Sequence, residues 1–165
     1  MRLNEGTDLQ DVLLFELRMS EQIVRDGHEV NPRFRIFTPS GHFIILLPLS
    51  DDASERQRRM RLVGLFMAWK LATGFVLSSE LHEPDAISAF GVSRNERQGL
   101  MRRIDRGAPI SFGETTELGE ADIEQGLVAL LPGRDVTMTS EMLADLERGF
   151  GEGGEMPAMR LGVPE

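Results

Sequence analysis

A β-hairpin pattern near the start of the chain constrains the fold more than any other feature. Residues 33–38 alternate polar and apolar side chains, which predicts a half-buried strand. Residues 43–49 are apolar and predict a second, more deeply buried strand. Pro39, Ser40 and Gly41 between the two segments are typical turn residues. The sequence therefore predicts an antiparallel hairpin, whose apolar side chains need helices to cover them.

Helical patterns lie on both sides of this hairpin. In residues 7–26, leucines recur near one face, and Thr7 and Gln10 have the spacing of a capping box at the helix start. Residues 53–72 predict a longer helix, because apolar side chains recur at spacings of three and four. Asp52 is placed to cap it. The chain thus begins in the order helix, strand, strand, helix.

The segment after Gly74 has two interpretations. In the first, residues 75–81 and 86–93 are two strands joined by His82, Glu83, Pro84 and Asp85, a second hairpin with good turn chemistry. In the second, residues 85–106 form two helices. Both interpretations predict a helix over residues 95–106, where Leu100, Met101 and Ile104 fall on one side.

The second interpretation depends on Ile87, Phe90, Gly91, Val92 and Ser93, followed by Leu100 and Ile104. This stretch resembles the helix-turn-helix of bacterial DNA-binding domains. The resemblance implies that Ser93, Arg94, Asn95 and Gln98 face DNA, and that Arg102, Arg103 and Arg106 contact phosphates. It covers only this part of the chain and departs from the pattern at two positions: Arg97 occupies a normally buried position, and Gly99 lies inside the second helix.

The last third of the sequence is acidic. Residues 120–131 predict one helix, and Thr139 or Ser140 can cap another that ends at Phe150. Residues 151–165 are rich in glycine and proline and predict a flexible tail. We therefore expect one α+β domain over residues 1–150, in which an antiparallel sheet of about four strands packs on a long central helix, with acidic C-terminal helices.

Charge is distributed unevenly along the chain. The formal net charge is −9, but residues 54–111 carry an excess of four positive charges. These arginines could form one basic patch that faces an acidic or phosphate-bearing partner. They could instead pair with the protein's own acidic C-terminal third. The predicted partner-binding residues are Arg56, Arg58, Arg59, Arg61, Arg94, Arg97, Arg102 and Arg103.

A second polar cluster surrounds the turn at residues 82–85. Glu80, His82, Glu83 and Asp85 can all bind a hard or borderline metal ion, but a site needs ligands that converge on one point. Glu80 and His82 can share one face of a strand, whereas Glu83 cannot join them without a turn. His28 and His42 are the remaining histidines that could complete a site. A solvated turn explains the same residues.

These observations favour a non-enzymatic binding or regulatory protein that acts through a protein partner. The chain has no cysteine or tyrosine, no phosphate-binding glycine loop and no nucleophile elbow, and we expect no cofactor. A DNA-binding regulator and a metal-dependent hydrolase around His82 are the alternatives. Self-association is compatible with the sequence. We expect a cytoplasmic location, because the polar residues after Met1 do not resemble a cleavable signal. We also expect no membrane insertion, because residues 62–77 fall short of the about 20 apolar residues that span a bilayer.

Overall fold

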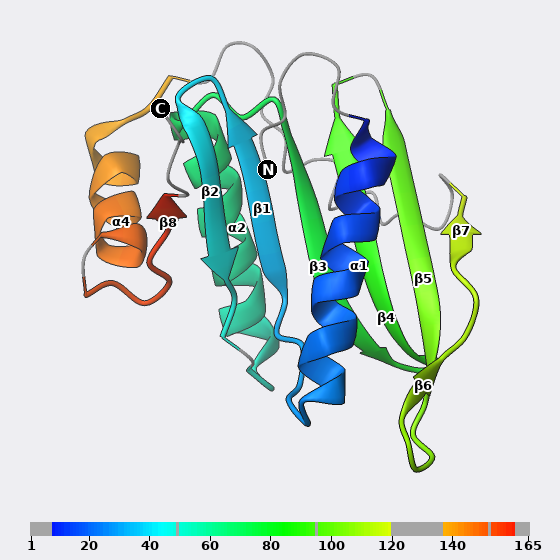
Figure 1. The fold of residues 1–165 in the computed structure, drawn as a ribbon. Coiled ribbons are helices and arrows are strands. Elements are labelled where there is room, and N and C mark those ends of the chain that lie inside the picture. The colour runs from blue at the N-terminus through cyan, green and yellow to red at the C-terminus, as the bar shows by residue number, and fades with distance from the viewer. Residues whose placement is uncertain (1–7, 49, 95, 120–136, 152, 161–165) are drawn as a thin grey trace.

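The structure is a computed structural model that describes residues 8–48, 50–94, 96–119, 137–151 and 153–160. Within these ranges the chain forms three helices and eight strands (Figure 1). The helices are α1 (Leu9–Arg25), α2 (Ala53–Trp69) and α4 (Ser140–Phe150). The strands are β1 (Arg33–Thr38), β2 (Gly41–Leu46), β3 (Gly74–His82), β4 (Asp85–Ser93), β5 (Arg97–Asp105), β6 (Ser111–Phe112), β7 (Thr116–Leu118) and β8 (Met159–Arg160).

The strands form one antiparallel sheet in the order β6-β5-β4-β3-β1-β2-β8, with β7 also paired to β5. The β1–β2 hairpin and the β3–β4 hairpin, both predicted, lie side by side because β1 pairs with β3. Phe34 of β1 is therefore opposite Ile45 on one side and Leu77 on the other. The second predicted strand of the first hairpin is shifted and covers Gly41–Leu46.

Helix α1 covers one face of the sheet at β3, β4 and β5 (Figure 1). Its N-cap is Asp8, whose carboxylate accepts a hydrogen bond from the backbone N–H of Gln10. Leu13 and Leu17 are buried in the same apolar cluster as Ile87 and Leu100 of the sheet. The apolar side chains whose spacing predicted this helix are the ones that it buries against the sheet.

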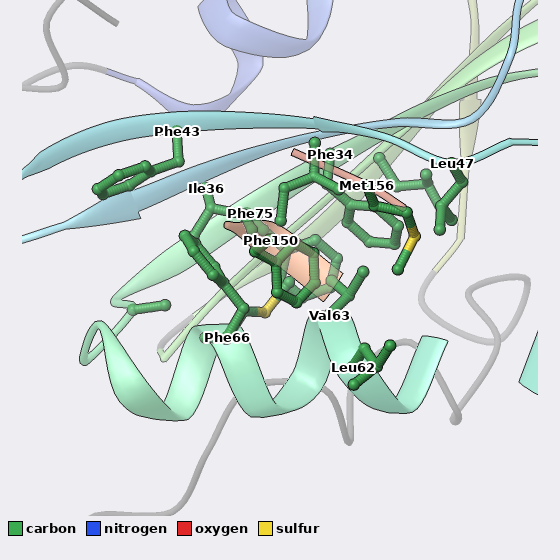
Figure 2. Close-up of a cluster of buried hydrophobic side chains, with 14 of the residues drawn as sticks. Phe34, Ile36, Phe43, Leu47, Leu62, Val63, Phe66, Phe75, Phe150 and Met156 are labelled. Carbon is green, nitrogen blue, oxygen red and sulfur yellow. The ribbon is translucent and has the colours of Figure 1, made fainter. Parts of the chain in front are cut away.

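Helix α2 covers the opposite face, mainly over β1, β2 and β3, and α4 packs against α2 near the β8 edge of the sheet (Figure 1). Figure 2 shows Val63 and Phe66 of α2 among the side chains of Phe34 and Phe75 from the strands. The Phe66 ring centroid lies 5.0 Å from that of Phe150, at the end of α4. The central sheet is therefore buried on both faces, which explains why β1 is buried along its whole length.

A buried ionic group lies between α1 and the sheet. Glu16 of α1 accepts hydrogen bonds from Arg33 and Arg35 of β1 and from the hydroxyl of Ser78 on β3. The carboxylate is completely buried. Burial by itself raises the pKa of Glu16, but the two guanidinium groups outweigh burial and hold that pKa below its ordinary value.

The chain returns to the sheet after α4. Met156 is buried in the α2 cluster, and Met159 and Arg160 pair with Ile44 and Phe43 of β2. These residues fall in the segment where we expected a flexible tail. In the structure they complete one edge of the sheet.

Two features of the expected fold are wrong. The chain is α+β, but its described sheet has eight strands rather than about four, and helices cover both faces instead of one central helix. The main cause is residues 95–106, predicted as a helix, of which Arg97–Asp105 form β5. Leu100 and Ile104 satisfy a strand period as well as a helical one. The helix expected at residues 140–150 is confirmed as α4, whereas residues 120–131 lie outside the described ranges.

Among the helices that the structure describes, none combines the length and the apolar character that crossing a bilayer requires.

Candidate functional site

The arginines predicted to bind a partner lie in two separate parts of the molecule. Arg56, Arg58, Arg59 and Arg61 belong to α2, which packs over β1, β2 and β3. Arg97, Arg102 and Arg103 lie on β5 and Arg94 in the turn before it, and β5 is two strands beyond β3. The structure therefore does not bring the eight side chains into one patch.

The sheet arginines do not share a direction either. Arg102 lies on the α1 side, where it donates to Glu21 of α1 over 2.7 Å and to the carbonyl oxygen of Gly113 over 3.0 Å. Arg103 follows it along the strand and faces the opposite side of the sheet. Residues 85–93 and 97–105 are antiparallel strands, so the helix-turn-helix interpretation of this segment is wrong.

Two of the α2 arginines bind the acidic C-terminal third of the chain, as one of our alternatives predicted. Arg58 donates to both carboxylate oxygens of Glu155 over 2.8 Å, and Arg59 donates to one of them over the same distance. These hydrogen bonds, from Arg58 first and then Arg59, lower the pKa of Glu155. Arg56 instead donates to the carbonyl oxygen of Ser50 at the start of α2. Arg61 has a different environment.

Arg61 lies on a groove between α2 and α4 with a volume of about 390 Å³. Gly149 of α4 lies next to Leu62 of α2 here, and a Cβ at Gly149 would lie 3.4 Å from Leu62 Cδ1, an ordinary contact. Arg148 of α4 also lines the groove and pairs with Asp145. The residues that line it are Arg58, Arg61, Leu62, Asp145, Arg148, Gly149 and Glu155. Three guanidinium groups and two carboxylates give this α2–α4 groove an excess of one positive charge.

Arg61 differs from the other two arginines of the groove. Within the described part of the chain it makes no hydrogen bond or ion pair, whereas Arg58 and Arg148 each have a carboxylate partner. Its side chain is exposed. The α2–α4 groove therefore offers a free guanidinium beside two others that are already paired at the surface.

A second polar site lies where β3 ends. Helix α1 ends at Arg25, and Gly27 just beyond it has a positive φ of 83° and turns the chain towards the sheet. This turn brings Glu29 beside Glu80 and His82, which share one face of β3 as predicted. The three residues line an open pocket of about 460 Å³, together with His28, Asp85 and Arg106 among others. We call this the β3-end pocket.

Arg106 organises the carboxylates of the β3-end pocket. It donates to both carboxylate oxygens of Asp85, over 2.6 and 3.0 Å, and to Glu80 Oε2 over 3.4 Å. The hydrogen bonds from Arg106 lower the pKa of Asp85. His82 Nε2 lies 3.5 Å from Glu29 Oε1 at the mouth of the pocket.

The structure thus gathers part of the polar cluster that the sequence indicated. Glu80, His82, Asp85 and His28 line one pocket, but Glu83 is an exposed turn residue that is not among the lining side chains. His42 is elsewhere, on β2 with its ring edge-on to Phe37 at 4.8 Å. Sequence reasoning missed Glu29, and only its helix-turn-helix alternative gave Arg106 a role, as a contact to DNA phosphates, whereas the structure places Arg106 beside Asp85. No local spacing links either residue to β3, so only the folded chain could reveal them.

No protein-family model, curated protein or solved structure matches the chain.

Proposed function

We propose that this protein is a non-enzymatic binding protein whose α2–α4 groove receives an acidic segment of a protein partner. The observation that carries this proposal is the free guanidinium of Arg61, which lies on a groove that two further arginines line. Guanidinium groups bind carboxylates through paired hydrogen bonds, so the groove is suited to aspartate or glutamate side chains.

The ion pairs already present in the groove would not prevent such binding. The Arg58 side chain is 49% exposed and the Arg148 side chain 75% exposed. Water screens exposed ion pairs and leaves them weak, so exchange of an internal carboxylate for one from a partner costs little. Arg61 adds an interaction that the free protein lacks. The binding free energy would come mainly from Arg61 and from contacts that surround it.

A protein partner suits this surface better than a nucleic acid. Three arginines and two carboxylates line the groove, and the chain as a whole carries a net charge of −9. Binding to duplex DNA depends on many phosphate contacts along a basic stripe. The segment that suggested DNA binding also forms strands rather than a recognition helix.

Selection from a random-peptide library displayed on phage tests the proposal. Wild-type protein would be the only bait, and the enriched peptides would afterwards be assayed for binding to Arg61→Glu. We expect enriched peptides that contain Asp or Glu and that bind Arg61→Glu at least about tenfold more weakly, a difference of about 1.4 kcal/mol. Arg97→Glu is the matched control, because Arg97 is exposed on β5 and outside the groove. It should bind the selected peptides like the wild type.

Three results would contradict the proposal. Selected peptides could lack acidic residues, or bind Arg61→Glu and the wild type equally. Fluorescence anisotropy could show tight, salt-sensitive binding of random-sequence duplex DNA at physiological salt, which would replace the protein partner by a nucleic acid. Circular dichroism of Arg61→Glu must match the wild type, as expected for an exposed side chain.

A further inference from the structure

We propose that Glu29, Glu80 and His82 form a binding site for a divalent transition-metal ion of the zinc type. This site is in the β3-end pocket, so it is independent of the α2–α4 groove and of the function proposed for that groove. The inference is based on the geometry of the three donors, on a buried carboxylate oxygen that lacks a partner, and on the charge of the surrounding residues.

The donor atoms already converge. One ligand atom from each of Glu29, Glu80 and His82 lies within 4.8 Å of the other two. Ligands of a tetrahedral zinc ion, at bond lengths near 2.0–2.2 Å, are about 3.4 Å apart. The separation of 3.5 Å between His82 Nε2 and Glu29 Oε1 already fits this value. Both side chains are exposed, so small rotations can bring them closer to Glu80.

The buried carboxylate of Glu80 gives a separate indication of a ligand. Its side chain is only 5% exposed, and its Oε1 atom has no hydrogen-bond partner in the part of the chain that the structure describes. Buried polar atoms without partners are rare in folded proteins, and each needs an explanation. Arg106 reaches only the other oxygen, Oε2. A bound cation would supply the missing partner of Oε1.

Arg106 does not make the site unsuitable for a cation. Its guanidinium pairs with both oxygens of Asp85, so its charge is compensated next to the pocket. Glu29, Glu80 and Asp85 together with Arg106 leave two negative charges, which match a divalent ion. The contact from Arg106 to Glu80 Oε2 also orients the carboxylate, as residues behind the ligands of metal sites commonly do.

The donor set indicates which kind of ion would bind. One imidazole and two carboxylates suit zinc, iron or nickel better than magnesium or calcium, which prefer oxygen ligands alone. Three protein ligands leave a fourth position for water, as in many zinc sites that are open to solvent. The open mouth of the pocket gives the ion a route from solvent.

Isothermal titration of chelator-treated protein with zinc chloride tests the site. We expect saturable uptake of one equivalent by the wild type. Glu80→Gln and His82→Ala should each weaken binding at least tenfold. Titration with cobalt(II) should give a visible absorption spectrum typical of mixed nitrogen and oxygen ligation, and zinc should displace it.

Matched control variants distinguish a specific metal site from non-specific binding of zinc at the protein surface. Glu83→Gln removes an exposed carboxylate beside the site, and His42→Ala removes a histidine on another strand; both should bind zinc like the wild type. Arg61→Glu should also bind normally, because it alters only the groove. Loss of binding in His82→Ala with full binding in Glu80→Gln would indicate a lone surface histidine and overturn the proposal. Absence of zinc uptake by folded wild-type protein would overturn it as well.

Discussion

Arg33 donates from Nε to Oε2 of Glu16 over 3.0 Å, and both side chains are buried between α1 and the sheet. The Arg35 guanidinium binds the other oxygen of the same carboxylate. One buried negative charge therefore serves two buried positive charges. The stability of such a group requires every member, because removal of one partner leaves the remaining charges unpaired in a medium of low dielectric constant.

Replacement of Glu16 by Gln should destabilise the fold strongly. The variant keeps the shape of the side chain but leaves two buried guanidinium groups without a carboxylate, which we expect to lower the free energy of unfolding by about 3–5 kcal/mol. Urea denaturation followed by circular dichroism measures the change. Glu117→Gln, at an exposed position on β7, is the control and should differ from wild type by less than about 0.5 kcal/mol. A loss as small as that of the control would show that the ionic group contributes little.

The same carboxylate predicts how stability depends on pH. The pKa of Glu16 is lower in the folded protein than its ordinary value of 4.5, so the stabilisation is fully present above that value. It is lost as the pH falls through the folded pKa. Glu155 and Asp85, whose pKa values are also lowered, act in the same direction at the surface. Urea denaturation from neutral pH downwards should show the difference between wild type and Glu16→Gln becoming smaller below that range. A difference that stays constant with pH would mean that Glu16 does not titrate in this way.

Gly91 should be intolerant of even a small side chain. A Cβ at this position of β4 would lie 2.7 Å from Leu9 Cδ1 and 3.0 Å from Leu9 Cγ, so the buried start of α1 would have to move. We expect Gly91→Ala to lower the free energy of unfolding by about 1–3 kcal/mol through overpacking. Gly113→Ala is the matched control, since its Cβ would meet only ordinary contacts at 3.7 Å or more. Equal thermal midpoints for the two variants would show that α1 adjusts without cost.

The C-terminal return should contribute to global stability. Met156 is 1% exposed and packs in the α2 cluster, whereas Met159 nearby is 50% exposed. Met156→Ala should lower the free energy of unfolding by about 2–5 kcal/mol, because it leaves a cavity in the core. Met159→Ala should have little effect. If both variants unfold like the wild type, residues 153–160 do not belong to the cooperative unit.

Local patterns predicted most of the elements but not their arrangement. Both hairpins, α1, α2 and α4 could be recognised from periodicity and caps, because these signals depend on neighbouring residues. The segment at Leu100 and Ile104 was misassigned, since the two residues fit a strand and a helix equally well. The sheet explains why residue 99 is a glycine, because a Cβ there would lie 3.0 Å from Phe90 and from Leu118. That constraint comes from two other strands and leaves no local signal.

In the candidate sites, too, local sequence predicted some features, whereas others depend on the fold as a whole. The face shared by Glu80 and His82 follows from strand geometry, so it was predictable. The approach of Glu29 depends on how α1 is seated on the sheet, and the pairing of Arg58 with Glu155 joins residues 97 positions apart. Such contacts depend on the topology of the whole domain. The spacing of the arginines along α2 therefore identified the candidate side chains, but it could not show which of them forms no ion pair.

The pairing of β8 with β2 also bears on the order in which the protein can be completed during synthesis. The β1–β2 hairpin is made early, yet β8, which pairs with β2 at Phe43 and Ile44, leaves the ribosome only after α4. Until then β2 lacks this pairing along its edge, and an unpaired strand edge is a place where chains associate wrongly. The nascent chain thus carries β2 without this partner until α4 and β8 have been made, so a strand made later completes the edge of one made earlier.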